Sequence, residues 1–263
     1  MTSISDLMRG DIPPRVRRFV KTVGRGINEF GMIGSGDSVL LGISGGKDSL
    51  SMALALALRR RWLPVSYSLN AVQIEWAEFP LPPESKEKLA EFFDAIEVPF
   101  RFLPAHMFPE SFRGKFNCYL CSRNRKRILF DEIRSLGITK VALGHHLDDI
   151  IETTLMNLFY HGQFGTMMPV QDFFRGGVQL IRPMCRVTEA AVRNLAAFLE
   201  LPVVSINCPH KDTTIRQDMK RIISSLAHKN RHVRDNIYRA PWNISTEYLP
   251  GQREEPACNS LRT

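Results

Sequence analysis

The sequence lacks any long hydrophobic run. No stretch approaches the ~18 consecutive apolar residues that a membrane-spanning helix requires, so we expect no membrane segment. The first residues, Met-Thr-Ser-Ile-Ser-Asp, have neither the charged region nor the apolar region of a secretory signal. Together these absences predict a cytoplasmic protein.

Cysteine is also scarce. The chain has 5 cysteines in 263 residues, and none precedes Cys118. An odd number of cysteines without a signal sequence argues against a disulfide framework and for a reducing compartment. The chain length and a hydrophobic content of 44% are enough for one large domain with a sizeable core.

Acidic residues are outnumbered by basic ones, 27 against 35, which gives a net charge of +8 and a sequence pI near 9.4. This balance favours a polyanionic partner such as RNA, and a solvated basic surface is the alternative. The basic residues cluster, which favours the RNA partner. The clusters are Arg15, Arg17, Arg18, Lys21 and Arg25; Arg123, Arg125, Lys126 and Arg127; and Lys211, Arg216, Lys220, Arg221, Lys229, Arg231 and Arg234.

A glycine-rich turn, Ser44-Gly-Gly-Lys-Asp-Ser49, separates the apolar run 38–43 from the Ala/Leu-rich stretch 50–58. Strand, turn and helix in this order form a cradle for phosphate, because main-chain N–H groups and the positive end of the helix dipole point at the anion. The glycines allow close approach and positive φ, the serines donate hydrogen bonds, and the lysine supplies charge. The candidate phosphate-binding residues are Ser44, Gly45, Gly46, Lys47, Asp48 and Ser49.

The turn is not a GxxxxGK[ST] loop, because Leu41 stands where that pattern has its first glycine. It resembles the SGGxDS pyrophosphate loop of the N-type ATP pyrophosphatases, which adenylate a substrate and release pyrophosphate. The alternative is an ordinary strand-to-helix turn that is rich in glycine. We therefore predict an ATP site at this turn.

A second polar turn, Gly144-His-His-Leu-Asp-Asp149, lies between an expected strand and an expected helix. Gly144 allows a nucleotide to approach the main chain, and an aspartate at the helix start can hold Mg²⁺ or orient a lysine. The aspartates can instead cap the helix, and the histidines can simply pack at the strand end. Both interpretations stay open at this point.

The hydrophobic periodicity predicts strands that alternate with helices. We expect helices over 14–33, 48–61, 86–96, 122–136, 149–160, 188–199 and 213–227, and strands over 38–43, 65–74, 99–103, 139–143, 178–181 and 203–206. This alternation predicts an α/β fold with a parallel sheet flanked by helices. Ligands of such sheets bind beyond the carboxyl ends of the strands, where the strand order reverses, so we expect the polar turns to converge there.

The chain is expected to have a basic amphipathic N-terminal helix in residues 1–34, a catalytic domain in residues 35–235 and a loosely held polar tail in residues 236–263. The Pro-rich stretch 79–84 is expected to break the chain before a helix.

The pair Cys118-Tyr-Leu-Cys121 places two thiolates on the same side of a turn, where they can bind one metal ion or cluster. The pair can also be core cysteines, a redox pair or half of a zinc site. Cys208 is the natural distant third ligand and Cys185 is its rival, whereas Cys258 lies in the polar tail. Three thiolates leave one position open, which suits a [4Fe-4S] cluster with a reactive iron better than a closed zinc site.

Several motifs together resemble the TtcA family of tRNA-cytidine 2-sulfurtransferases, which make 2-thiocytidine in the anticodon loop. They are ISGGKDS at 43–49, CxxCSRxR at 118–125, LGHHxDD at 143–149, ETTLMNLFYHG at 152–162, IRPM at 181–184, Cys208 and RQDMKRII at 216–223. The resemblance covers residues 15–235, and residues 75–84 and 209–214 depart from the family pattern.

The resemblance implies a Rossmann-like fold of the adenine nucleotide alpha-hydrolase type and an ATP-dependent tRNA thiolase that releases AMP and pyrophosphate. It implies Mg²⁺ on an aspartate and tRNA and a cysteine desulfurase or another sulfide donor as partners, and its members also suggest a homodimer. The implied site residues are Asp149, Lys47 and Arg125 in catalysis, Ala71, Gln73, Gly144 and His145 near the adenine of ATP, and Cys118, Cys121 and Cys208 on a [4Fe-4S] cluster.

Three other functions stay open. A lysidine-type or other amidating adenylase would use the same phosphate loop and leave the cysteine pair unused. A nucleotide- or zinc-binding module would have no catalysis. A desulfidase would need no ATP turnover, and the intact SGGKDS turn argues against it.

Overall fold

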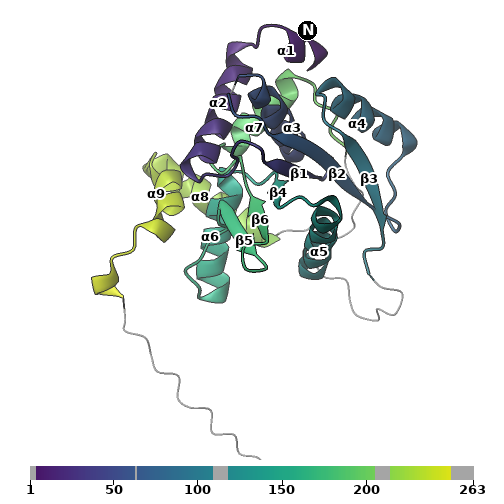
Figure 1. Cartoon of the computed structure of the whole chain (residues 1–263). Helices are drawn as coiled ribbons and strands as arrows, with labels where there is room; N and C mark the ends of the chain where they lie inside the picture. Colours follow the sequence, from purple (N-terminus) through teal and green to yellow (C-terminus); the bar gives the residue numbers. More distant parts are fainter. Residues whose placement is uncertain (1–3, 63, 109–117, 205–213, 250–263) are drawn as a thin grey trace, which may run out of the picture.

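The computed structural model describes residues 4–62, 64–108, 118–204 and 214–249, and for Cys118 and Thr214 it describes the main chain alone. Within these residues the strands form one sheet in the order β3 (Phe100–Ala105), β2 (Ser68–Trp76), β1 (Ser38–Ile43), β4 (Lys140–Leu143), β6 (Val178–Ile181) and β5 (Val170–Phe173) (Figure 1). Neighbouring strands are parallel, except that β5 is antiparallel to β6. The predicted parallel sheet is therefore confirmed.

Every helix that the periodicity predicts is present, with ends that differ by a few residues. The helices are α1 (Ile4–Arg9), α2 (Pro14–Glu29), α3 (Lys47–Arg60), α4 (Pro83–Ala95), α5 (Cys118–Leu136), α6 (Leu147–His161), α7 (Glu189–Phe198), α8 (Thr214–Lys229) and α9 (Val233–Arg239), with the short 3₁₀ turns η1 (Ala240–Trp242) and η2 (Thr246–Tyr248). The helix α4 begins inside the Pro-rich stretch, because proline is tolerated in the first helical turn. The helix α5 begins at Cys118, so the cysteine pair lies in its first turn and not in a preceding turn.

Three short elements, α1, α9 and β5, are not predicted by the sequence pattern. The strand β5 has polar Gln171 and Asp172 at its centre and lies at the sheet edge, where no second face needs to be apolar. The strand expected over 203–206 is absent at Val203 and Val204, and its last two residues lie outside the described residues. The N–H of Val203 bonds to Leu201 O and that of Val204 to Gly45 O, so neither is available to a sheet.

The two faces of the sheet bury different helices. Leu40 and Ile74 share one core cluster with Leu129 of α5. Val39 and Leu41, on either side of Leu40 in β1, belong to a larger cluster that includes residues of α2, α3, α6 and α7. This period of two, with both faces buried, is the pattern of a parallel sheet covered by helices on both sides.

The helix α2 buries an apolar stripe in the same core as α3, as its periodicity predicts. The stripe comprises Val16, Phe19, Val20, Val23 and Ile27. At the other end of the chain, the ring of Trp242 lies 5.2 Å from that of Tyr238 and 6.2 Å from that of Phe30. The start of the polar tail therefore packs on α2 and α9. In the described part of the chain, none of the helices has the length and apolar character that crossing a membrane requires.

Candidate active site

The phosphate loop closes on itself between β1 and α3. The N–H of Ser44 donates to Ser49 Oγ over 3.2 Å, and Ser49 Oγ donates to Gly46 O over 3.0 Å. Gly45 has φ +77°, in the region that favours glycine. No side chain of the described residues caps the start of α3 at Gly46. The first N–H groups of α3 are therefore available to an anion.

A buried amide lies behind this loop. Gln73, inside β2, is 0% exposed, and neither its amide oxygen nor its amide nitrogen has a hydrogen-bond partner within the described residues. A Cβ added to Gly45 would lie 3.5 Å from Gln73 Nε2 and only 2.3 Å from Val204 Cγ2. A buried amide without partners is costly, which indicates that a ligand or water completes this position.

The second polar turn packs directly against the first. A Cβ on Gly144 would lie 2.9 Å from the main chain of Ser49, so the glycine lets β4 approach α3. The helix α6 is capped by His146, whose Nδ1 accepts from the N–H of Asp149 over 3.3 Å, while Asp149 Oδ2 accepts from the N–H of His146 over 2.9 Å. Asp148 instead binds the start of α7, which Thr188 caps: its Oδ2 accepts from the N–H of Glu189 over 2.7 Å, and it pairs with Arg234.

The neighbouring histidines therefore differ in role. His145 lines the cavity described below, and its buried Nδ1 has no hydrogen-bond partner within the described residues. Burial and the nearby Arg182 guanidinium lower the pKa of His145 to about 4, so its ring is neutral at pH 7. A neutral imidazole can donate to or accept from a nucleotide or a base.

One cavity of about 490 Å³ joins the two polar turns to α5. It lies beyond the ends of β1 and β4, where the strand order reverses, as the sequence predicts. Of the predicted site residues, its walls contain Ser44, Asp48, Ser49, Gly144, His145, Asp149, Cys121 and Arg125. They do not contain Gly45, Gly46, Lys47, Ala71 or Gln73. Ala71 is buried in the sheet, with its N–H bonded to Pro99 O, and is not exposed to the cavity.

Asp149 belongs to a chain of ion pairs between α6 and α8. Its Oδ1 lies 3.0 Å from Arg216, which also lies 3.6 Å from the carboxylate of Glu152. Lys220 continues the chain, 3.9 Å from Glu152 and 2.9 Å from Glu189. Burial alone would raise the pKa of Asp149, but the charge of His146, the hydrogen bond from the His146 N–H and the charge of Arg216 together lower it. Asp149 is therefore an anion at neutral pH.

Lys47 is held beside the loop and not inside the cavity. Its Nζ lies 3.1 Å from Asp48 Oδ1 and 3.9 Å from Glu189 Oε1. Asp48 Oδ1 is buried and accepts no hydrogen bond within the described residues, although the lysine charge is near. The lysine stem can rotate its charge toward a phosphate, because the side chain is about one-third exposed.

Three cations of the cavity, Lys126, Arg182 and Arg216, were not predicted as site residues. Arg182 is 4% exposed; it donates to Met168 O, and its Nε has no partner within the described residues. Burial lowers its pKa to about 10, so it stays charged. Arg182 directly follows β6, and this position after a parallel strand is the signal that could have identified it.

The cysteines separate into two environments. Cys121 is half-buried in the cavity wall, and Cys118 is the first residue of α5. Cys185 is 0% exposed, its thiol lies against Gly26 of α2, and burial raises its pKa to about 12. Cys208 and Cys258 lie outside the described residues. Among the residues that the structure describes, no group of three or more His, Cys, Asp or Glu side chains could hold a metal ion.

Known proteins resemble this chain along most of its length. The PP-loop domain model matches residues 19–205. The tRNA-cytidine(32) 2-sulfurtransferase of Burkholderia ambifaria is 34% identical over 94% of this chain and 74% of its own length. This chain belongs to the PP-loop family of tRNA-cytidine 2-sulfurtransferases. Its relative from Xanthomonas oryzae pv. oryzae is 33% identical over 89% of this chain and 77% of that protein. The predicted family is thus confirmed.

A solved structure shows the same fold. The U34-tRNA thiolase NcsA from Methanococcus maripaludis, determined with its [4Fe-4S] cluster, superposes with a TM-score of 0.70. It is 21% identical and covers 91% of this chain and 82% of its own. This likeness confirms the Rossmann-like, adenine nucleotide alpha-hydrolase type of fold for this family member.

Proposed function

We propose that this chain is an ATP-dependent tRNA sulfurtransferase that adenylates a tRNA base, cytidine at C2, and replaces its oxygen by sulfur. The observation that carries the proposal is the single cavity in which the phosphate loop, Asp149, Arg125 and Cys121 meet. The curated relatives are named for cytidine thiolation, which supports the choice of base. The partners would be tRNA and a sulfide donor such as a cysteine desulfurase.

ATP would bind with its phosphates on the turn from Ser44 to Ser49. The uncapped start of α3 and the positive φ of Gly45 support this assignment. The unpartnered groups of His145 and Gln73 would complete the nucleotide site. Mg²⁺ prefers carboxylate and phosphate oxygens, and Asp48 Oδ1 is a buried carboxylate oxygen that accepts no hydrogen bond within the described residues. Asp48 would therefore share Mg²⁺ with the phosphates.

In the first step the C2 oxygen of the base attacks the α-phosphorus of ATP, and pyrophosphate leaves with the electron pair of the broken P–O bond. Lys47 and the N–H groups of the loop would stabilise the charge that develops on the phosphates. Removing one such group typically costs about 100-fold in rate. Asp149 and Arg216 hold each other in the cavity wall, so a base that enters meets a fixed anion.

In the second step a sulfide ion adds at C2, the C2–O bond breaks, and AMP leaves with the former C2 oxygen. Arg125 would hold the phosphate of the departing AMP, because it lines the same cavity. A [4Fe-4S] cluster on Cys118, Cys121 and Cys208 would supply the open iron that carries sulfide.

The described residues fit this ligand set better than its rival with Cys185. Val204, four residues before Cys208, donates to Gly45 O over 2.9 Å, and Arg216, beyond it, pairs with Asp149. The described residues before and after Cys208 therefore both lie next to residues of the candidate active site. The thiol of Cys185 lies against α2 instead.

Mass spectrometry of nucleosides from tRNA tests the function directly. We expect tRNA from cells without this protein to lose one thionucleoside, 2-thiocytidine, and the purified protein with ATP and sulfide to restore it with release of AMP and pyrophosphate. An unchanged set of thionucleosides would contradict the proposal. A single thionucleoside other than 2-thiocytidine would correct the base and keep the reaction.

A further inference from the structure

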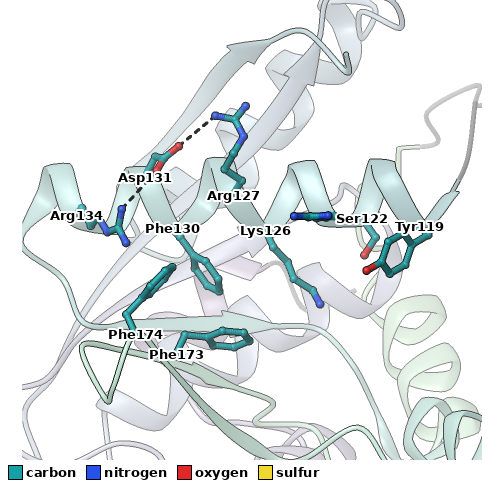
Figure 2. A pocket seen from close by; sticks show the side chains of 10 residues that line it. Tyr119, Ser122, Lys126, Arg127, Phe130, Asp131, Arg134, Phe173 and Phe174 are labelled. Atoms are coloured by element: carbon teal, nitrogen blue, oxygen red, sulfur yellow. Dashed lines mark hydrogen bonds and ion pairs between the residues drawn. The ribbon is translucent and has the colours of Figure 1, made fainter. Parts of the chain in front are cut away.

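A second hollow lies beside the candidate active site, between α5 and the turn that joins β5 to β6. It has a volume of about 500 Å³, and we refer to it as the α5–hairpin groove (Figure 2). Its walls are formed by Tyr119, Ser122, Arg123, Lys126, Arg127, Phe130, Asp131, Arg134, Phe173 and Phe174. The proposed thiolation reaction assigns none of the aromatic residues a role.

The groove carries an excess of positive charge. Its cations come from successive turns of one helix, and among the described residues of its walls Asp131 is the only acid. Asp131 lies 3.4 Å from Arg127 and 4.0 Å from Arg134, and Figure 2 shows it on the side of α5 away from the phenylalanine rings. One carboxylate cannot neutralise four cations, so the groove attracts a polyanion.

Aromatic rings form the other wall. The ring of Phe130 lies 4.9 Å from that of Phe173 and 5.6 Å from that of Phe174, and Figure 2 shows the three rings together beneath α5. Phe174 is nevertheless 55% exposed, and the Arg134 guanidinium lies 4.4 Å from the centre of its ring. Phe174 has a φ of +53°, which bulky residues rarely adopt. The turn nevertheless exposes this large apolar ring to solvent. Exposed rings interleaved with cations are the usual platform for single-stranded nucleic acid.

The groove is continuous with the candidate active site. Ser122 and Lys126 line both hollows. Along α5, Tyr119 and Arg134 are about 22 Å apart at ~1.5 Å per residue. About six stacked nucleotides at ~3.4 Å each would cover this length. A strand on this surface would therefore pass the mouth of the cavity that contains Asp149.

We infer that the α5–hairpin groove binds the single-stranded RNA next to the base that enters the active site, with a neighbouring base stacked on Phe174 and Arg134. This inference rests on the proposed function. Phosphates of the strand lie along Arg123 and Lys126, and the target base turns into the adjoining cavity. Duplex RNA has no unstacked base to offer the ring, so the groove selects for a loop.

Fluorescence anisotropy with two probes tests the inference: a labelled single-stranded RNA of about twelve nucleotides and a duplex of the same length. F174A should raise the Kd for the single strand about tenfold and change the Kd for the duplex far less. F174Y keeps a ring and should bind like the wild type. R134A removes the guanidinium that lies over the Phe174 ring, so it should also raise the Kd for the single strand and change the Kd for the duplex far less.

Two control variants are matched to these changes. Phe159, in the last turn of α6, is 56% exposed and lines neither hollow, so F159A removes an equally exposed ring. Lys88 is exposed on α4, so K88A removes the same charge as R134A. Thermal unfolding and ATP binding are measured for every variant, and a value near the wild type shows that the fold is intact.

The outcomes separate the inference from the function on which it rests. If wild-type protein binds and thiolates RNA while F174A and R134A bind like the controls, the groove is not the RNA site and the proposed function stands. If the wild type binds neither probe nor tRNA, both are overturned. Equal weakening of single-stranded and duplex binding by F174A would also overturn base stacking. If F174A does not fold, the comparison of R134A with K88A decides.

Discussion

The cavity has two walls that differ in how their charges are balanced. On the α6–α8 wall, Arg216 pairs with Asp149 of the same wall and with Glu152, which does not line the cavity. The α5 wall contains Cys121 and Arg125, and no ion pair of Arg125 is found among the described residues. The charges of the first wall are paired within the fold, whereas Arg125 of the second has no ion pair among the described residues. If the proposed function holds, substrate contacts would concentrate on α5.

Burial explains the contrast. Glu152 is 2% exposed, and an unpaired carboxylate there would be strongly destabilising, so this wall must pair its charges within the fold. Arg125 on α5 is only partly buried, so water can solvate its charge without a partner from the fold. Four changes test this difference, from the largest expected effect to the smallest.

C121S should abolish thiolation and the broad visible absorbance of anaerobically purified protein, because a serine hydroxyl is a poor cluster ligand. ATP binding, measured by calorimetry, should remain near the wild type, since the phosphate loop lies on other elements. C185S is the control, and we expect it to keep the absorbance. Loss of absorbance in C185S but not in C121S would reverse the assignment of ligands.

D149N should lower the rate of AMP release about 100-fold, because it removes the fixed anion of the cavity while an amide oxygen can still accept from the N–H of His146. D148N, its matched neighbour, should leave the rate near the wild type and reduce the free energy of unfolding by about 1–2 kcal/mol, since it weakens the pair with Arg234. Rates from single-turnover assays and urea unfolding curves measure the two effects. Equal rate losses would mean that both aspartates serve catalysis.

G45A tests the phosphate loop, which lies next to the cavity. We expect the free energy of unfolding to fall by about 2 kcal/mol, because alanine is strained at φ +77° and its Cβ would lie 2.3 Å from Val204 Cγ2. ATP affinity should fall as well. G176A, at φ +87° with open space around its Cβ, is the control for strain without a clash and should lose less. An ATP affinity equal to that of the wild type would argue against phosphate at this turn.

E152Q tests the pH dependence of the α6–α8 wall. Burial raises the pKa of Glu152 to about 7, from its ordinary 4.5, despite the nearby Lys220 ammonium. The folded state therefore holds a proton that the unfolded state releases between pH 4.5 and about 7, so this group's contribution to stability is present below pH 4.5 and is lost as the pH rises to about 7. The free energy of unfolding of the wild type, minus that of E152Q, should be larger at pH 5 than at pH 8. A difference that grows with pH would mean that the ion pairs with Arg216 and Lys220 outweigh burial.

Much of the fold follows from local sequence patterns. The strand β1 and the helix α3 are predicted almost to the residue, because an apolar run, a glycine turn and an Ala/Leu stretch leave few alternatives. The convergence of two turns follows from the rule for parallel sheets. The short elements α9 and β5 escape prediction, because their stability comes from tertiary contacts such as Tyr238 with Trp242.

The chemistry of the site is less accessible from sequence. Asp148 and Asp149 are adjacent and identical in type, yet one binds α7 and Arg234 and the other faces the cavity. Arg216 reaches Asp149 from 67 residues away, and no local spacing signals such a pair. The predicted roles of Lys47 and Arg125, and of the cysteines as cluster ligands, remain predictions.

Gly144 has a hydrogen atom in place of a side chain, and this determines how closely the two polar turns of the cavity pack. Gly144 packs on the main chain of Ser49 with no side chain between them, so the two polar turns are in direct main-chain contact. A methyl group at Gly144 would push the turn after β4 away from the start of α3 and widen the cavity opening. The width of the cavity opening therefore depends on the absence of a side chain at Gly144.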